Sequence, residues 1–92
     1  MEISHPLENL VGEDVVVDLS SPFVCMGTLV SFNDSFLVLK NADMHDLRDT
    51  HTSRENYVAS SVVTGIKRNR KRVFLAMREV VALAILREVV DE

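Results

Sequence analysis

Five cationic side chains lie within six consecutive positions in the second half of the chain. They are half of all its lysines and arginines: Lys67, Arg68, Arg70, Lys71 and Arg72. Cations at this density can neutralise several phosphate groups, which is the electrostatic basis of nucleic-acid binding. The alternative is a solvated turn that offsets an acidic surface, because the net charge of the chain is −4. No aromatic residue stands among these cations, which weakens the case for a site that stacks single-stranded bases.

A second group that could do chemistry lies in the polar stretch from residue 43 to residue 53. It contains two histidines and three aspartates: Asp43, His45, Asp46, Asp49 and His51. Imidazole and carboxylate groups are ligands of divalent metal ions. Their spacing matches no recognised zinc pattern, however, and the stretch has no helical or strand period that would fix the side chains. We therefore expect a solvated loop here, with no metal and no cofactor.

Nucleophilic catalysis has little support in the sequence. Cys25 stands between Val24 and Met26 in an apolar stretch, where a buried and inert thiol is expected. No pattern pairs this thiol with any of the three histidines. The three glycines are too widely separated to form a phosphate-binding loop. These observations predict that the protein is not an enzyme.

The length and composition are those of one folded domain spanning residues 1–92. A domain of this size has a thin core, so burial through self-association would stabilise it. The opening residues 1–6 are polar, and the single cysteine cannot form an intrachain disulfide. No apolar run approaches the roughly 18–20 residues that a membrane span needs. We therefore expect a cytoplasmic protein without membrane contact.

The apolar pattern predicts a mainly β protein with two helices. Ser4 can cap a short first helix over about residues 4–11. Leu7, Leu10 and Val11 would form its apolar stripe. Strands are expected at about residues 14–19, 23–32, 36–42, 72–77 and 80–87, and Gly27 marks a bend in the second.

A second helix is predicted between strands three and four, over about residues 53–65. Thr52-Ser-Arg-Glu55 has the pattern of a capping box, and Gly65 is a natural helix end. Because the stretch is rich in β-branched residues, a strand is the alternative.

Three stretches of this pattern resemble the Sm-like (LSm) family. The stretches are Leu7-x-x-Leu10-x-Gly12-x-x-Val15-x-Val17-x-Leu19, then Gly27-Thr-Leu-Val-Ser-Phe-Asn-Asp34 with Phe36-Leu-Val-Leu39, and finally Val73-Phe-Leu-Ala-Met-Arg-Glu-Val80-Val81-x-Leu83. The resemblance implies an Sm-like fold, in which a short N-terminal helix precedes a strongly bent five-stranded antiparallel sheet that forms a small barrel. It also implies a ring in which the fourth strand of one subunit pairs with the fifth strand of the next.

The resemblance also implies where RNA would bind. In RNA-binding members, two turns that face the central hole form the base pocket, and the matching residues here are Asn33, Asp34, Ser35 and Arg78. Both turns depart from the family pattern. The first is about one residue short and lacks the usual Asn, and Ala76-Met77 stands where Arg-Gly is usual. The alternative is that the first three residues only shape a turn and that Arg78 pairs with Glu79 or with a neighbouring subunit.

The last two expected strands are apolar on both faces, so a monomer would expose one of them. Pairing of these strands between subunits would bury that face, and the expected interface residues are Val73, Phe74, Leu75, Val81, Leu83 and Ile85. We predict a homo-oligomeric ring of roughly five to eight subunits, because a closed ring leaves no strand edge unpaired.

Two functions follow from these features. The first is a ring-forming, RNA-associated module with a non-standard base pocket, for which single-stranded RNA is the partner. The alternative is a ring-shaped structural or protein-interaction scaffold that has lost RNA binding. The basic cluster (residues 67–72) favours the first function, whereas the altered turns and the net acidity favour the second.

Overall fold

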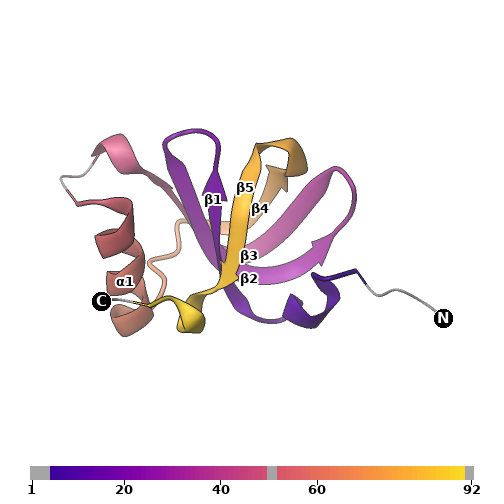
Figure 1. Ribbon diagram of the computed structural model, residues 1–92, viewed down its shortest axis with the longest axis horizontal. Coiled ribbons are helices and arrows are strands. Elements are labelled where there is room, and N and C mark those ends of the chain that lie inside the picture. The colour runs from indigo at the N-terminus through magenta and orange to yellow at the C-terminus, as the bar shows by residue number, and fades with distance from the viewer. Residues whose placement is uncertain (1–4, 50–51, 91–92) are drawn as a thin grey trace.

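One five-stranded antiparallel sheet organises the molecule. The computed structural model describes residues 5–49 and 52–90. The strands are β1 (Asp14–Leu19), β2 (Phe23–Phe32), β3 (Phe36–Asp46), β4 (Arg70–Ala76) and β5 (Val80–Ile85), in the sheet order β4-β3-β2-β1-β5 (Figure 1). The described residues also form one α-helix, α1 (Arg54–Thr64), and four short 3-10 helices. The predicted fold class, a bent five-stranded sheet with a helix between strands three and four, is confirmed.

The N-terminal helix is shorter than the sequence predicts. A single 3-10 turn, η1 (Glu8–Leu10), stands within the expected range of 4–11. The amide of Leu10 donates to the carbonyl oxygen of Leu7, an i→i+3 bond that tightens the turn. Gly12, with φ of 92°, then redirects the chain into β1. The predicted cap, Ser4, lies outside the described residues.

The sheet bends at Gly27 of β2, where this strand pairs with β3. Met26 pairs with Asp43 and Thr28 pairs with Lys40, so Gly27 alone faces two residues of β3. This arrangement is a β-bulge, and Asn41 within it has φ of 50°. A Cβ atom on Gly27 would lie 3.0 Å from the Lys40 carbonyl oxygen and from the Ala42 side chain. The predicted bend at Gly27 is therefore confirmed, and only glycine fits there without movement of β3.

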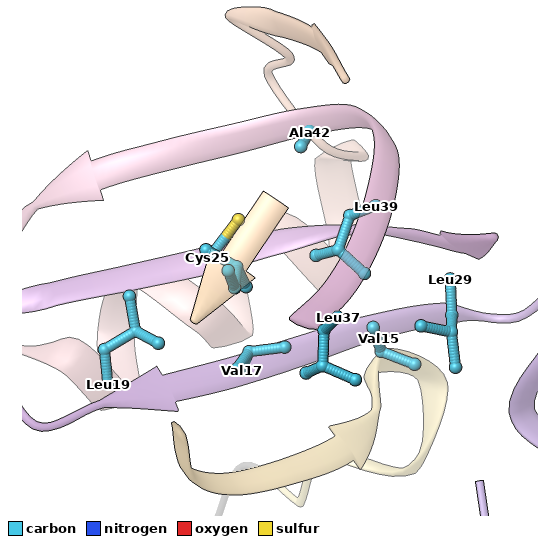
Figure 2. Packing of buried hydrophobic residues seen from close by; sticks show 9 residues of the cluster. Val15, Val17, Leu19, Cys25, Leu29, Leu37, Leu39 and Ala42 are labelled. Atoms are coloured by element: carbon cyan, nitrogen blue, oxygen red, sulfur yellow. The ribbon is translucent and has the colours of Figure 1, made fainter. Parts of the chain in front are cut away.

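The barrel interior is aliphatic. Alternate residues of the strands point inward and form a continuous cluster, in which Val15, Val17, Leu37 and Leu39 are fully buried (Figure 2). Leu75 of β4 completes this cluster at 4% exposure. Leu7 and Leu10 pack against it from the N-terminal segment. β1 and β4 are thus joined by one core despite their distance in the sequence.

The inserted helix α1 covers the outer face of the sheet (Figure 1). A second group of buried side chains, the outer cluster, lies between them: Val16, Val24, Met26, Val58 and Leu86. The helix begins at Ser53, whose Oγ accepts a hydrogen bond of 3.2 Å from the Asn56 amide, so the cap is Ser53 and not Thr52 as the capping-box pattern predicts. The alternative interpretation of this stretch as a strand is wrong.

The C-terminal elements differ from expectation at their ends. A 3-10 helix, η3 (Met77–Glu79), joins β4 directly to β5. The last strand ends at Ile85 and not near residue 87, because Leu86–Glu88 forms the 3-10 helix η4 and buries Leu86 in the outer cluster. Within the described ranges, no helix is both long and apolar enough to cross a lipid bilayer.

Candidate functional site

Two turns at one end of the barrel form a hollow of about 380 Å³, here called the turn hollow. It is lined by Asp34, Ser35, Phe36, Ala76 and Arg78. The amide of Met77 donates to the Ser35 carbonyl oxygen at 2.8 Å and holds the two turns together. Three of the four turn residues predicted from the sequence therefore meet in one place, although the turns are 42 residues apart.

The fourth predicted residue, Asn33, does not line the turn hollow. Its side-chain oxygen accepts hydrogen bonds of 2.8 Å from the amides of both Ser35 and Phe36. Its own amide donates to the Phe36 carbonyl oxygen at 2.9 Å. Asn33 therefore shapes the turn, which is the alternative that its residue type also suggested.

Phe36 is the lining residue that sequence reasoning missed. Its side chain is 42% exposed, and it meets the 60% exposed Phe74 edge to face with ring centroids 6.3 Å apart. An exposed aromatic ring beside a cation and polar groups can stack a nucleotide base. One signal in the sequence could have identified Phe36. It directly follows a polar turn, at a position where a strand with one solvated face more often carries a polar residue.

Arg78 extends into solvent at the rim of the turn hollow. Its side chain is 87% exposed and lies 4.0 Å from the Glu79 carboxylate. An exposed ion pair at this distance contributes little and leaves the guanidinium free to move. Glu79 also accepts a hydrogen bond of 2.7 Å from the Ser20 hydroxyl. Arg78 can therefore exchange its weak pair for a phosphate oxygen.

The basic cluster lies at the opposite end of β4 from the turn hollow. All five cations are exposed: Lys67, Arg68, Arg70, Lys71 and Arg72. None of the five takes part in an ion pair among the described residues. The structure therefore gives two separate candidate surfaces, one at each end of the same strand.

The polar stretch considered as a metal site is largely strand and not loop. β3 continues to Asp46 because Asp43, at 2% exposure, accepts hydrogen bonds from the Tyr57 hydroxyl and from Asn69. His45 stacks on the Tyr57 ring at 3.8 Å. The solvated loop expected over residues 43–46 is thus wrong. His51 lies outside the described residues, and within them no three ligand-type side chains gather.

Asp46 is engaged by an arginine close in sequence. The Arg48 guanidinium lies 2.8 Å from its carboxylate, and the Arg48 amide also donates to it at 2.9 Å. These hydrogen bonds lower the pKa of the Asp46 carboxyl to about 2. The Asp46 carboxylate therefore stabilises the turn after β3.

Cys25 is fully buried in the barrel core. Burial raises the pKa of its thiol to about 12, and the nearby Asp43 carboxylate acts in the same direction. The thiol is therefore protonated at every physiological pH, which makes it a poor nucleophile.

Native Cys25 is expected to resist a thiol-specific reagent such as dithiobisnitrobenzoate at pH 8. The thiolate fraction at that pH is roughly a thousandfold smaller than for an unfolded thiol, since the pKa lies about three units higher. The absorbance change on reaction with the reagent, followed over time with and without urea, would measure the reaction rates of the unfolded and the native thiol. Equal rates would contradict the buried placement.

The free edges of the sheet are β4 and β5. Each edge strand carries an exposed apolar side chain, Phe74 at 60% and Val81 at 68%. Val73, Leu83 and Ile85 are half-buried. The side chain of Leu75, also predicted at the interface, is buried in the core of its own barrel, and its place at an interface stays a prediction.

Two solved structures share this architecture. One is an Sm protein of Pyrococcus abyssii in complex with a uridine heptamer, at 18% identity over 89% of this chain and 99% of that chain, with a TM-score of 0.60. The other is a chain of the NatC complex bound to CoA, at 20% identity over 98% of this chain and 100% of that chain, with a TM-score of 0.58. No protein-family model matches the sequence, and no curated protein does.

The structural likeness extends over nearly the whole chain. Because the sequence identity is low, the likeness shows the fold alone. The chain therefore has the Sm-like fold that its sequence pattern resembles.

Proposed function

We propose that this protein is a non-catalytic, cytoplasmic Sm-like module that assembles into a homo-oligomeric ring and binds single-stranded RNA. The observation that carries the proposal is the turn hollow, where the exposed ring of Phe36 lies beside Arg78, Asp34 and Ser35. An aromatic face, a cation and hydrogen-bonding groups are the three elements by which proteins hold an unpaired base and its phosphate.

Assembly is supported by the two free edges of the sheet. A strand edge with unpaired backbone groups and exposed apolar side chains tends to pair with another strand. Phe74 and Val81 give β4 and β5 this character. Closure into a ring of roughly five to eight subunits satisfies both edges of every copy, and it would bring one turn hollow from each subunit to the assembly.

Binding to RNA is supported by the similar Sm protein, which was solved with a uridine heptamer. The pocket of this chain would work differently from the family pattern, because Asn33 is occupied by its own turn. Base stacking on Phe36 and a phosphate contact from Arg78 would then replace the usual amide contact. We therefore expect weak base selectivity.

The variants Phe36→Ala and Arg78→Ala are each expected to weaken binding of a fluorescein-labelled oligouridylate by about fivefold or more at low salt, since stacking contributes roughly 1–3 kcal/mol per base. Fluorescence anisotropy measures the affinity. Arg48→Ala is the matched control, because Arg48 is an exposed arginine paired with Asp46. Unchanged affinity in both variants, with wild-type mass, would contradict the proposed pocket.

A second candidate is a structural subunit that binds proteins and not RNA. The observation in its favour is the likeness to a NatC chain over the full length of both molecules. The ratio of absorbance at 260 and 280 nm of the purified protein separates the two candidates. Co-purifying nucleic acid favours the RNA-binding ring, and a clean protein spectrum with no oligouridylate binding favours the scaffold.

A further inference from the structure

The cations of the basic cluster differ from every other arginine in the described part of the chain. Arg48, Arg54, Arg78 and Arg87 each lie within 4.0 Å of a carboxylate. The ion pairs of the described residues include none of the cluster cations, although the chain as a whole is acidic. An acidic protein that leaves its densest group of cations unpaired keeps them available to an anion from outside.

The sheet also sets like charges against each other beside this cluster. Lys40 of β3 lies directly opposite Arg72 of β4, and both are exposed. Like charges in this position destabilise a strand pair. The excess of positive charge beside the cluster therefore extends from β4 onto β3.

Part of the cluster surrounds a surface hollow of about 330 Å³, here called the basic hollow. Its lining consists of three cations and two amides and includes no carboxylate: Asn41, Arg68, Asn69, Arg70 and Lys71. The guanidinium and ammonium groups of the three cations donate hydrogen bonds, and arginine matches the geometry of phosphate oxygens. Lys67 and Arg72 belong to the cluster but do not line the basic hollow.

The frame of the basic hollow is fixed before any ligand arrives. Asn69 is tied to β3 by four hydrogen bonds: its amide donates to the Ala42 carbonyl oxygen, its side-chain oxygen accepts from the Met44 amide, and its side-chain nitrogen donates to Asp43 and to the Met44 carbonyl oxygen. The left-handed backbone of Asn41 brings this residue to the hollow from the bulge in β3. A fixed frame reduces the entropy lost on binding.

We infer that the basic hollow is a phosphate-binding subsite, separate from the turn hollow at the other end of β4. Arg68, Arg70 and Lys71 supply the positive charge, and Asn69 positions the two arginines that flank it in sequence. The inference rests on the proposed function only for the source of the phosphate, which would be the backbone of single-stranded RNA.

Two double variants test the inference with equal loss of charge. Arg68→Gln/Lys71→Gln removes two cations from the lining, and Lys67→Gln/Arg72→Gln removes one lysine and one arginine from outside it. The probes are a fluorescein-labelled oligouridylate and inorganic polyphosphate, which has no bases. The lining variant is expected to lose about tenfold or more in affinity for both probes, and the control about twofold. The slope of log affinity against log salt concentration is also expected to be smaller by about one in the lining variant, as for one lost phosphate contact.

Equal losses in the two double variants would overturn the inference, because the cluster would then act only as a diffuse positive field. Absence of polyphosphate binding to the wild-type protein would overturn it as well. If polyphosphate binds through the lining residues while oligouridylate does not bind, the phosphate subsite stands and the RNA-binding function falls. Circular dichroism of each variant checks that the exposed substitutions leave the fold unchanged.

Discussion

The substitution Phe74→Glu is expected to leave the subunit folded and to reduce the ring to subunits of 10.3 kDa. Phe74 alternates with the buried Leu75 along β4, so its side chain points out of the barrel at 60% exposure. A carboxylate there adds no strain to the monomer. In the ring, the same carboxylate would be taken out of water without a partner, which costs several kcal/mol at each interface.

Light scattering coupled to size exclusion measures the mass of this variant. The matched control is Val63→Glu, since Val63 is 84% exposed on α1 and belongs to neither edge strand. The control should keep the wild-type mass. A Phe74→Glu variant with wild-type mass would show that the outer surface of β4 is not at the interface.

Among the side chains of the inserted helix α1, that of Tyr57 is expected to stabilise the fold most. The substitution Tyr57→Phe removes the hydroxyl that donates to Asp43 and leaves a carboxylate of 2% exposure with Asn69 as its remaining side-chain donor. Loss of one hydrogen-bond donor to this buried carboxylate is expected to lower the free energy of unfolding by about 1–3 kcal/mol. Burial and the Asp43 hydrogen bond both raise the Tyr57 pKa, so the hydroxyl is a neutral donor at any pH used for the measurement.

The substitution Tyr57→Ala is expected to cost about 3–5 kcal/mol in total, because it also removes a ring that packs on the outer cluster. That ring stacks on His45 at 3.8 Å. Urea unfolding followed by circular dichroism, at one fixed protein concentration, measures both losses. Val63→Ala on the same helix should stay within about 0.5 kcal/mol of wild type. A Tyr57→Phe variant as stable as wild type would contradict the role given to the Asp43 network.

The sheet was predictable because its signals are local. Gly27 marks the bulge, the polar residues 33–35 mark a turn, and the consecutive β-branched residues of β1 mark a strand. The end of β3 was not predictable in this way. Residues 43–46 read as a polar loop, but they pair with residues 23–26 of β2. Tyr57 and Asn69, distant in sequence, satisfy the Asp43 side chain that this pairing buries.

The candidate site was predictable in part for a similar reason. The resemblance placed Asp34, Ser35 and Arg78 together, and the structure brings all three to the turn hollow. The role of Phe36 depends on its exposure and on the direction of its ring toward Phe74, which strand periodicity alone does not determine. The division of the basic cluster likewise involves the bulge, which places Asn41 in the lining of the basic hollow with Arg68, Arg70 and Lys71.

Native mass spectrometry of the wild-type protein, purified without added nucleic acid, tests the claim of a self-assembling ring most directly. We expect one dominant species whose mass is a whole multiple of 10.3 kDa, in the range of roughly five to eight subunits for a closed ring. A monomer that persists across protein concentrations would contradict it.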